Sequence, residues 1–330
     1  MIYFSLEIWY NYYGDKMIVR KLNYFRLISF IVVLCLIVFG IIKLVSFINY
    51  KGTIEYKLLN IGYSQKEVDV LTKELNSDEI NKLLTMKKDS NIVSLSKEKY
   101  FLFKNLDKYL EYKKENDSTD NSDIVAIVNT EANIDWMDNE KEADTSKGNL
   151  MLVNRIYGLS SDYEPDDIVD VPSLYAYSGK KISESILNDI ISLIESGKED
   201  GYTFVVSDGY RSYKEQQSLY NNYKNSYGQS EADIYVAKPG HSDYQTGLSF
   251  DLMPYNKVIE NPSESEEYKW LKENAYKYGF IFRLPKDKEK LTGFKASTWR
   301  LRYVGTEAST VIYNENLCLE EYIAYWGNNG

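Results

Sequence analysis

The sequence predicts an α+β fold that follows a single membrane-spanning helix. Three observations lead to this prediction. Residues 27–48 are almost uninterruptedly apolar, which suits a helix that crosses a bilayer. After residue 148, segments with helical and with strand patterns follow one another irregularly. No glycine-rich phosphate loop accompanies them, so a doubly wound nucleotide-binding fold is not expected.

Composition excludes several kinds of site before any motif is considered. The 330 residues include 39 basic and 49 acidic side chains, a net charge of −10, whereas nucleic-acid binders need a basic surface. Two cysteines cannot form a four-thiolate zinc site, and one histidine cannot supply the two imidazoles of a usual zinc hydrolase. We therefore expect no nucleic-acid partner and no ordinary zinc centre.

The N-terminal region is organised around the apolar segment 27–48. Its 22 residues are close to the roughly 20 that span a bilayer and are too many for a signal peptide. Basic residues stand at positions 20, 21 and 26, so the positive-inside rule places residues 1–26 in the cytoplasm. The chain after residue 50 is then outside the cell membrane. Met17 is an alternative start, directly before the short basic leader.

Residues 49–112 are predicted to form a helical region. Ser64 and Glu67 have the spacing of a capping box, and apolar residues follow them at helical intervals up to Leu75. A second helical segment is expected from Glu79 to Leu84.

Residues 113–148 are predicted to be an acidic linker. They contain ten acidic residues against four lysines, and their composition is otherwise polar. The apolar run IVAIVNT, at 124–130, interrupts the linker and is predicted to be an embedded strand.

The remaining residues, 149–330, are predicted to form the main domain. Amphipathic patterns predict helices at 183–196 (ending at Gly197), 213–227, 268–278 and 309–325. Short apolar or alternating runs predict strands at 202–207, 247–253, 280–284 and 299–305.

Five stretches of this domain form an ordered set. They are DGYRSYKEQ (208–216), PGHSDYQTGLSFD (239–251), the segment 270–293, STWRLRYVG (297–305) and LCLEEYI (317–323). Together, over about residues 148 to 326, they resemble the VanY-like D-alanyl-D-alanine carboxypeptidases of bacterial cell walls. The resemblance implies a central, mostly antiparallel sheet flanked by helices, and a zinc-dependent D,D-carboxypeptidase activity.

In that family two motifs hold the zinc ion. S-x-H-x-x-G-x-A-x-D supplies a histidine and an aspartate, and E-x-W-H supplies the catalytic glutamate and a second histidine. The resemblance places Tyr244 and Arg300 at the two histidine positions and Ser297 at the glutamate position. Of the metal set only Asp251 is retained. No catalytic residue is therefore intact, and we expect no cofactor unless the zinc ion of the family is bound after all.

Other routes to hydrolysis are poorly supported by the residues. His241 lies three positions before the first ligand position and is expected to be a loop histidine at the pocket rim. Tyr244 would have to ligate a metal as a phenolate, although a tyrosine pKa is near 10. Ser242 and Ser297 have no evident base beside them for nucleophilic catalysis.

A charge replacement is predicted at the former metal site. Without a metal Asp251 would be an uncompensated charge, and Arg300 can neutralise it. We predict an Asp251–Arg300 ion pair with Tyr244 as a hydrogen-bond partner. The resemblance further implies a retained substrate cleft, lined by Arg211, Gln216, Ser242, Gln245, Asp251, Trp299 and Tyr303.

These observations favour a membrane-anchored, catalytically inactive VanY-like protein, a pseudoenzyme. Its cleft is expected to bind peptidoglycan stem peptide, or else a cell-wall or membrane protein. Two alternatives remain open. One is an active zinc D-alanyl-D-alanine carboxypeptidase that remodels peptidoglycan, and the other is a structural or assembly protein whose cleft has collapsed.

Overall fold

The computed structural model describes residues 24–135 and 139–327. They belong to two compact units, Met1–Val93 and Ser94–Gly330. Most of the predicted cytoplasmic segment, with Met17, lies outside the described residues.

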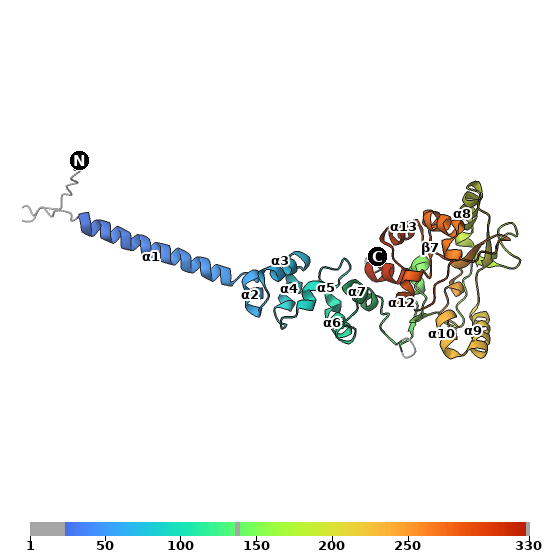
Figure 1. Ribbon diagram of the computed structural model, residues 1–330, viewed down its shortest axis with the longest axis horizontal. Coiled ribbons are helices and arrows are strands. Elements are labelled where there is room, and N and C mark those ends of the chain that lie inside the picture. The colour runs from blue at the N-terminus through green and yellow to red at the C-terminus, as the bar shows by residue number, and fades with distance from the viewer. Residues whose placement is uncertain (1–23, 136–138, 328–330) are drawn as a thin grey trace, which may run out of the picture. The chain divides into compact units, whose positions relative to one another are not determined.

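The first unit begins with one long helix, α1 (Figure 1). It spans Tyr24–Lys51, and none of its residues is buried. Its 28 residues correspond to about 42 Å of helix, more than the hydrocarbon core of a bilayer. α1 contains the whole predicted span 27–48, and by length and composition it is able to cross a membrane.

Four short helices follow α1: α2 (Ile54–Ile61), α3 (Gln65–Glu74), α4 (Ser77–Leu83) and α5 (Ser90–Leu95). The predicted capping box begins α3, where the Ser64 N–H donates to the Glu67 carboxylate at 2.7 Å. Asn76 and Glu79 form a second capping box, which starts α4 two residues before the predicted position. The apolar faces of these helices are buried at Leu58, Val68, Leu71, Ile80 and Leu83.

The predicted strand at 124–130 is wrong, because this run forms the helix α7 (Asn121–Asn129). Ile124, Val125, Ile127 and Val128 are buried, a spacing that places them on one side of a helix. They pack with Leu95 and Tyr109, and Tyr109 belongs to α6 (Leu106–Glu115). Tertiary packing thus overrides the strand preference of β-branched residues. The acidic stretch carries part of a hydrophobic core rather than only linking two domains.

A four-stranded antiparallel sheet is the centre of the second unit, which confirms the predicted α+β class. Its strand order is β5-β6-β8-β7. The four strands are β5 (Phe204–Asp208), β6 (Ser249–Pro254), β7 (Phe280–Phe282) and β8 (Arg300–Tyr303). Two small sheets accompany it: β1 (Lys141–Glu142) with β2 (Tyr157–Gly158), and β3 (Ile168–Asp170) with β4 (Lys181–Ser183).

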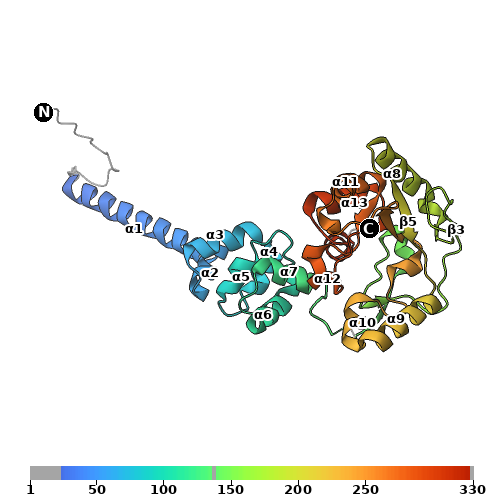
Figure 2. The ribbon, with the colours of Figure 1, turned by 45° about the vertical axis from the view of Figure 1, so that its right-hand side comes forward.

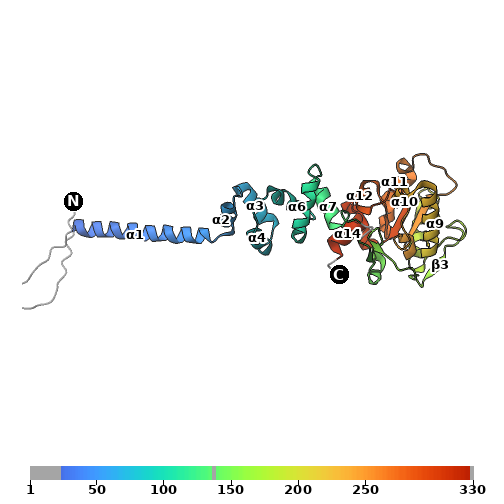
Figure 3. The same ribbon diagram turned by 90° about the horizontal axis from the view of Figure 1, so that it is seen from below.

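Seven α-helices between residues 187 and 326 surround the sheet or its connections. They are α8 (Leu187–Glu199), α9 (Tyr213–Tyr227), α10 (Gln229–Tyr235), α11 (Glu266–Asn274), α12 (Glu289–Thr292), α13 (Thr306–Glu315) and α14 (Leu319–Trp326). α9 and α10 lie side by side (Figure 2). α12 and α14 contact α7 (Figure 3). α8 continues past the predicted end at Gly197, because that glycine packs under the Phe204 ring instead of capping the helix.

The two faces of the sheet differ in polarity, because successive side chains of a strand point to opposite faces. Phe250 and Leu252 of β6 and Leu301 of β8 are buried in one core, together with residues of α8 and α11. The alternate positions of the same strands are Ser249, Asp251, Arg300 and Arg302. This polar face carries the candidate site.

Candidate functional site: an arginine, a tyrosine and an aspartate

Asp251 and Arg300 lie directly opposite each other on neighbouring strands. They are paired in the register of β6 and β8. The third member of the cluster, Tyr244, lies in a single 3-10 turn, Asp243–Thr246, which precedes β6. Gly247 ends this turn in the left-handed conformation and returns the chain into the sheet.

The predicted ion pair is present. Arg300 Nε lies 3.6 Å from Asp251 Oδ1 and donates to the Tyr244 hydroxyl oxygen at 2.9 Å. The same hydroxyl donates to Asp251 Oδ1 at 2.5 Å. The two charged side chains are about one quarter exposed, at 27% and 24%. Tyr244 therefore bridges a partly buried cation and anion.

The protonation states of the cluster follow from burial. Burial raises the pKa of Tyr244 far above its usual value, so its hydroxyl stays protonated and able to donate. Burial alone would lower the pKa of Arg300, but the neighbouring Tyr244 and Asp251 outweigh it and raise the pKa. At neutral pH the cluster thus holds a guanidinium and a neutral phenol.

A second arginine reaches the same tyrosine. The guanidinium carbons of Arg211 and Arg300 each lie 4.5 Å from the centre of the Tyr244 ring. Arg211 donates to Asp208 at 2.5 Å and to Gln216 at 2.7 Å, which joins it to the predicted Gln216. Lys180 also approaches Asp208, at 3.5 Å. Sequence reasoning missed Asp208 and Lys180, although Asp208 opens the DGYRS motif.

Three of the predicted cleft residues are buried, namely Gln216, Ser242 and Gln245. Gln245 is fully buried and donates to the backbone carbonyl oxygens of Ser160 and Tyr163. Ser242, which is 5% exposed, precedes the turn that carries Tyr244. Ser242 and Gln245 shape the loop that holds Tyr244.

Trp299 and Tyr303 do not lie where the predicted cleft requires them. Both pack against the apolar core, on the face of the sheet opposite Arg300. Tyr303 lies one position past Arg302 in β8, so the strand alternation turns it away from the cluster. Its ring contacts Phe280. These two side chains stabilise the sheet and do not line the polar face.

His241 and Ser297 also lie outside the cluster's hydrogen bonds. His241 is buried rather than at a rim, with Nδ1 2.8 Å from the Asn154 carbonyl oxygen. Its ring lies against Gly158, where any Cβ would come within 2.8 Å. The backbone N–H of Ser297 donates to the Leu284 carbonyl oxygen, at the entry to β8.

A buried network of charged side chains adjoins the cluster at Asp243. Arg283 and Arg302 both bind Asp243, the residue next to Tyr244. Arg283 also pairs with Glu320 of α14, at 2.7 Å and 3.1 Å. Both arginines are fully buried, and Arg283 belongs to the stretch 270–293, for which no site role was predicted. The network fixes the turn that carries Tyr244 to the C-terminal helix.

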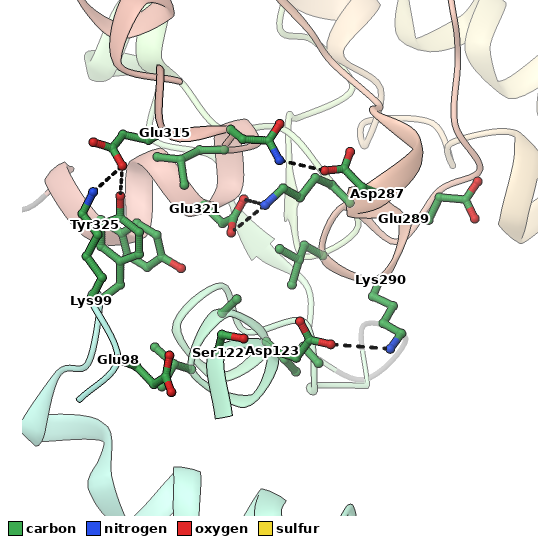
Figure 4. Close-up of a pocket in the computed structure, with 18 of the residues that line it drawn as sticks. Glu98, Lys99, Ser122, Asp123, Asp287, Glu289, Lys290, Glu315, Glu321 and Tyr325 are labelled. Atoms are coloured by element: carbon green, nitrogen blue, oxygen red, sulfur yellow. Dashed lines mark hydrogen bonds and ion pairs between the residues drawn. The ribbon is translucent and has the colours of Figure 1, made fainter. Parts of the chain in front are cut away.

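A separate cavity of about 610 Å³ lies between α7, residues 286–291 and α13–α14 (Figure 4). Its wall does not include Asp251, Arg300 or Tyr244. Its charged groups largely neutralise one another through the pairs Lys99–Glu315, Lys288–Glu321 and Lys290–Asp123. The cavity is therefore a feature distinct from the arginine–tyrosine–aspartate cluster.

Comparison with known proteins identifies the family. The family model described as VanY, D-alanyl-D-alanine carboxypeptidase, matches residues 179–306. A D-alanyl-D-alanine carboxypeptidase of Enterococcus faecalis (strain ATCC 700802 / V583) is 34% identical over 193 residues, which cover 56% of this chain and 69% of the relative.

Two solved structures are similar as well. The LdcB LD-carboxypeptidase is 34% identical with a TM-score of 0.53, over 56% of this chain and 90% of that one. A VanY D,D-pentapeptidase variant in complex with Zn(II) is 33% identical with a TM-score of 0.48, over 53% and 98%. The identity to the Enterococcus faecalis enzyme and the fold shared with LdcB agree, and the chain belongs to the VanY family of D-alanyl-D-alanine carboxypeptidases.

Proposed function

We propose that this chain is a metal-free, catalytically inactive VanY-type protein that binds peptidoglycan stem peptide at the outer face of the cytoplasmic membrane. The main support for this proposal is the Arg300–Tyr244–Asp251 cluster. It fills the positions at which the resemblance expects the zinc ligands, and the Asp251 carboxylate, the Tyr244 hydroxyl and the Arg300 Nε are partners of one another without a metal.

The donor set does not fit a zinc ion. A guanidinium has no lone pair to offer a cation, and the Arg300 charge lies 3.6 Å from the retained Asp251. The raised pKa of Tyr244 keeps its hydroxyl protonated, which opposes a phenolate ligand. Within residues 24–135 and 139–327, no three His, Cys, Asp or Glu side chains are grouped so that they could hold a metal.

The position of the general base supports the same proposal. The family motif requires a glutamate where this chain has Ser297. A serine hydroxyl does not accept a proton from water at neutral pH, so the step that generates the nucleophile has no base. Loss of the base and of two ligands together disfavours residual hydrolysis.

Membrane anchoring is part of the proposal. It is supported by the length and apolar composition of α1 and by the basic residues before it. In this arrangement the second unit faces the peptidoglycan, which is where stem peptides occur.

The test is a metal and activity assay on the full chain in detergent. We expect less than one zinc ion per ten chains after dialysis against zinc, and no D-alanine released from a pentapeptide ending in D-Ala-D-Ala. The triple variant Tyr244→His, Ser297→Glu, Arg300→His restores the motif residues and is expected to gain zinc. Stoichiometric zinc and D-alanine release by the unmodified chain would establish the alternative, an active carboxypeptidase.

A further inference from the structure

Arg300 has hydrogen-bond donors that the protein itself does not use. Its Nε is engaged by Tyr244 and Asp251, but neither Nη group donates to any residue of the described chain. The side chain is 27% exposed. Neither Nη atom is fully enclosed by the protein. Both Nη groups are therefore unpaired and at least partly accessible to solvent.

The guanidinium is held in a fixed orientation. The Tyr244 ring lies against it, and its Nε is tied to the tyrosine hydroxyl. A planar guanidinium that presents two parallel N–H groups matches the two oxygens of a carboxylate. Because the orientation is set before binding, little side-chain entropy is lost when a ligand arrives.

The charge balance of the surroundings favours an anion. The side chains joined around Tyr244 comprise three cations, Lys180, Arg211 and Arg300, and two carboxylates, Asp208 and Asp251. Tyr244 itself is neutral. The sum is one net positive charge, which a single carboxylate would neutralise.

We propose that Arg300 binds the C-terminal carboxylate of a trimmed stem peptide, so that the ligand is a shortened peptide and not the uncleaved one. This inference rests on the proposed function. Arg300 stands where the resembling enzymes hold the metal that polarises the bond to be cut. An amide carbonyl there offers one neutral oxygen, whereas a free carboxylate offers two oxygens and a charge. The preferred ligand thus ends at the residue before that bond.

Binding is measured by calorimetry with the full chain in detergent. Three synthetic ligands are compared: a stem tetrapeptide ending in D-Ala, its C-terminal amide, and the pentapeptide ending in D-Ala-D-Ala. We expect the tetrapeptide to bind about tenfold more tightly than its amide, and also more tightly than the pentapeptide. Equal affinity for tetrapeptide and amide would overturn this inference while leaving stem-peptide binding intact. Failure of all three peptides to bind would overturn the proposed function and this inference together.

Variants assign the preference to Arg300. Arg300→Gln is expected to reduce the tetrapeptide-to-amide ratio below about threefold, and Arg300→Lys, which keeps the charge without the fork, to give an intermediate ratio. Lys269→Gln changes an exposed cation of α11 and is expected to leave the ratio unchanged. An unchanged ratio in both Arg300 variants, with folding verified by circular dichroism, would also overturn the inference.

Discussion

Arg300 and Asp251 face each other across β6 and β8, and the Tyr244 hydroxyl donates to the aspartate while it accepts from the arginine. The aspartate compensates the charge of the arginine, and the neutral tyrosine hydroxyl bridges the two side chains.

The ion pair is expected to contribute measurably to stability. Arg300→Met leaves Asp251 with the tyrosine hydroxyl as its only partner in the cluster. Breaking a fully buried pair costs about 3–5 kcal/mol, and the partial exposure of this pair reduces the expected loss to about 1–2 kcal/mol. Urea unfolding of Arg300→Met, Asp251→Asn and the double variant measures the coupling. Purely additive losses would show that the two side chains do not interact.

Arg283 is expected to matter far more for stability. Arg283→Met leaves Asp243 with one partner and Glu320 without its cation, both in the interior. The free energy of unfolding should fall by about 3–5 kcal/mol. Lys269→Met, which breaks an exposed pair with Glu266, should change it by less than about 1 kcal/mol. Similar losses in the two variants would contradict this account of the network.

Gly247 is expected to be intolerant of a side chain. Its φ is +70°, and a Cβ would lie 2.7 Å from Ile168 Cδ1 and 3.1 Å from the Ser183 nitrogen. Gly179, in the turn between β3 and β4, has a φ of +75° but nothing within 4 Å, so it isolates the backbone effect. Gly179→Ala should cost about 1–2 kcal/mol. Gly247→Ala should cost about 1–3 kcal/mol more, because the neighbours must also move. Equal costs in denaturant unfolding would exclude the steric contribution.

The first unit is expected to lose stability in acid through Glu67. The Ser64 N–H, Lys88 and the Ser64 hydroxyl lower the pKa of Glu67 to about 2, below the value of about 4.3 in an unfolded chain. The stabilisation is therefore complete above about pH 4.3 and disappears as the pH falls toward 2.

Helicity measured between pH 2 and 6 tests this prediction. The acid-induced loss should be smaller in Glu67→Gln than in the unmodified chain. Lys88→Met removes only one of the partners of Glu67 and should give an intermediate profile. Superimposable acid profiles for all three proteins would rule out the capping box as the cause.

The sequence alone determined much of the polar site. Opposite charges at Asp251 and Arg300 predicted their pairing, with Tyr244 as the hydrogen-bond partner. Local patterns also determined the start of α3, where Ser64 caps its own helix, and both limits of α9. These features depend on neighbouring residues or on chemical identity, which a sequence displays directly.

Only the tertiary structure decided the rest. The β-branched residues of the run 124–130 favour a strand, but the run forms α7. Leu95 and Tyr109 pack against one face of this helix and bury it. Trp299 and Tyr303 turned to the core because the register of β8 fixes which alternate residues face Asp251. Contacts between distant segments select the face and the partner, and the energy of those contacts exceeds the local preferences that a sequence reveals.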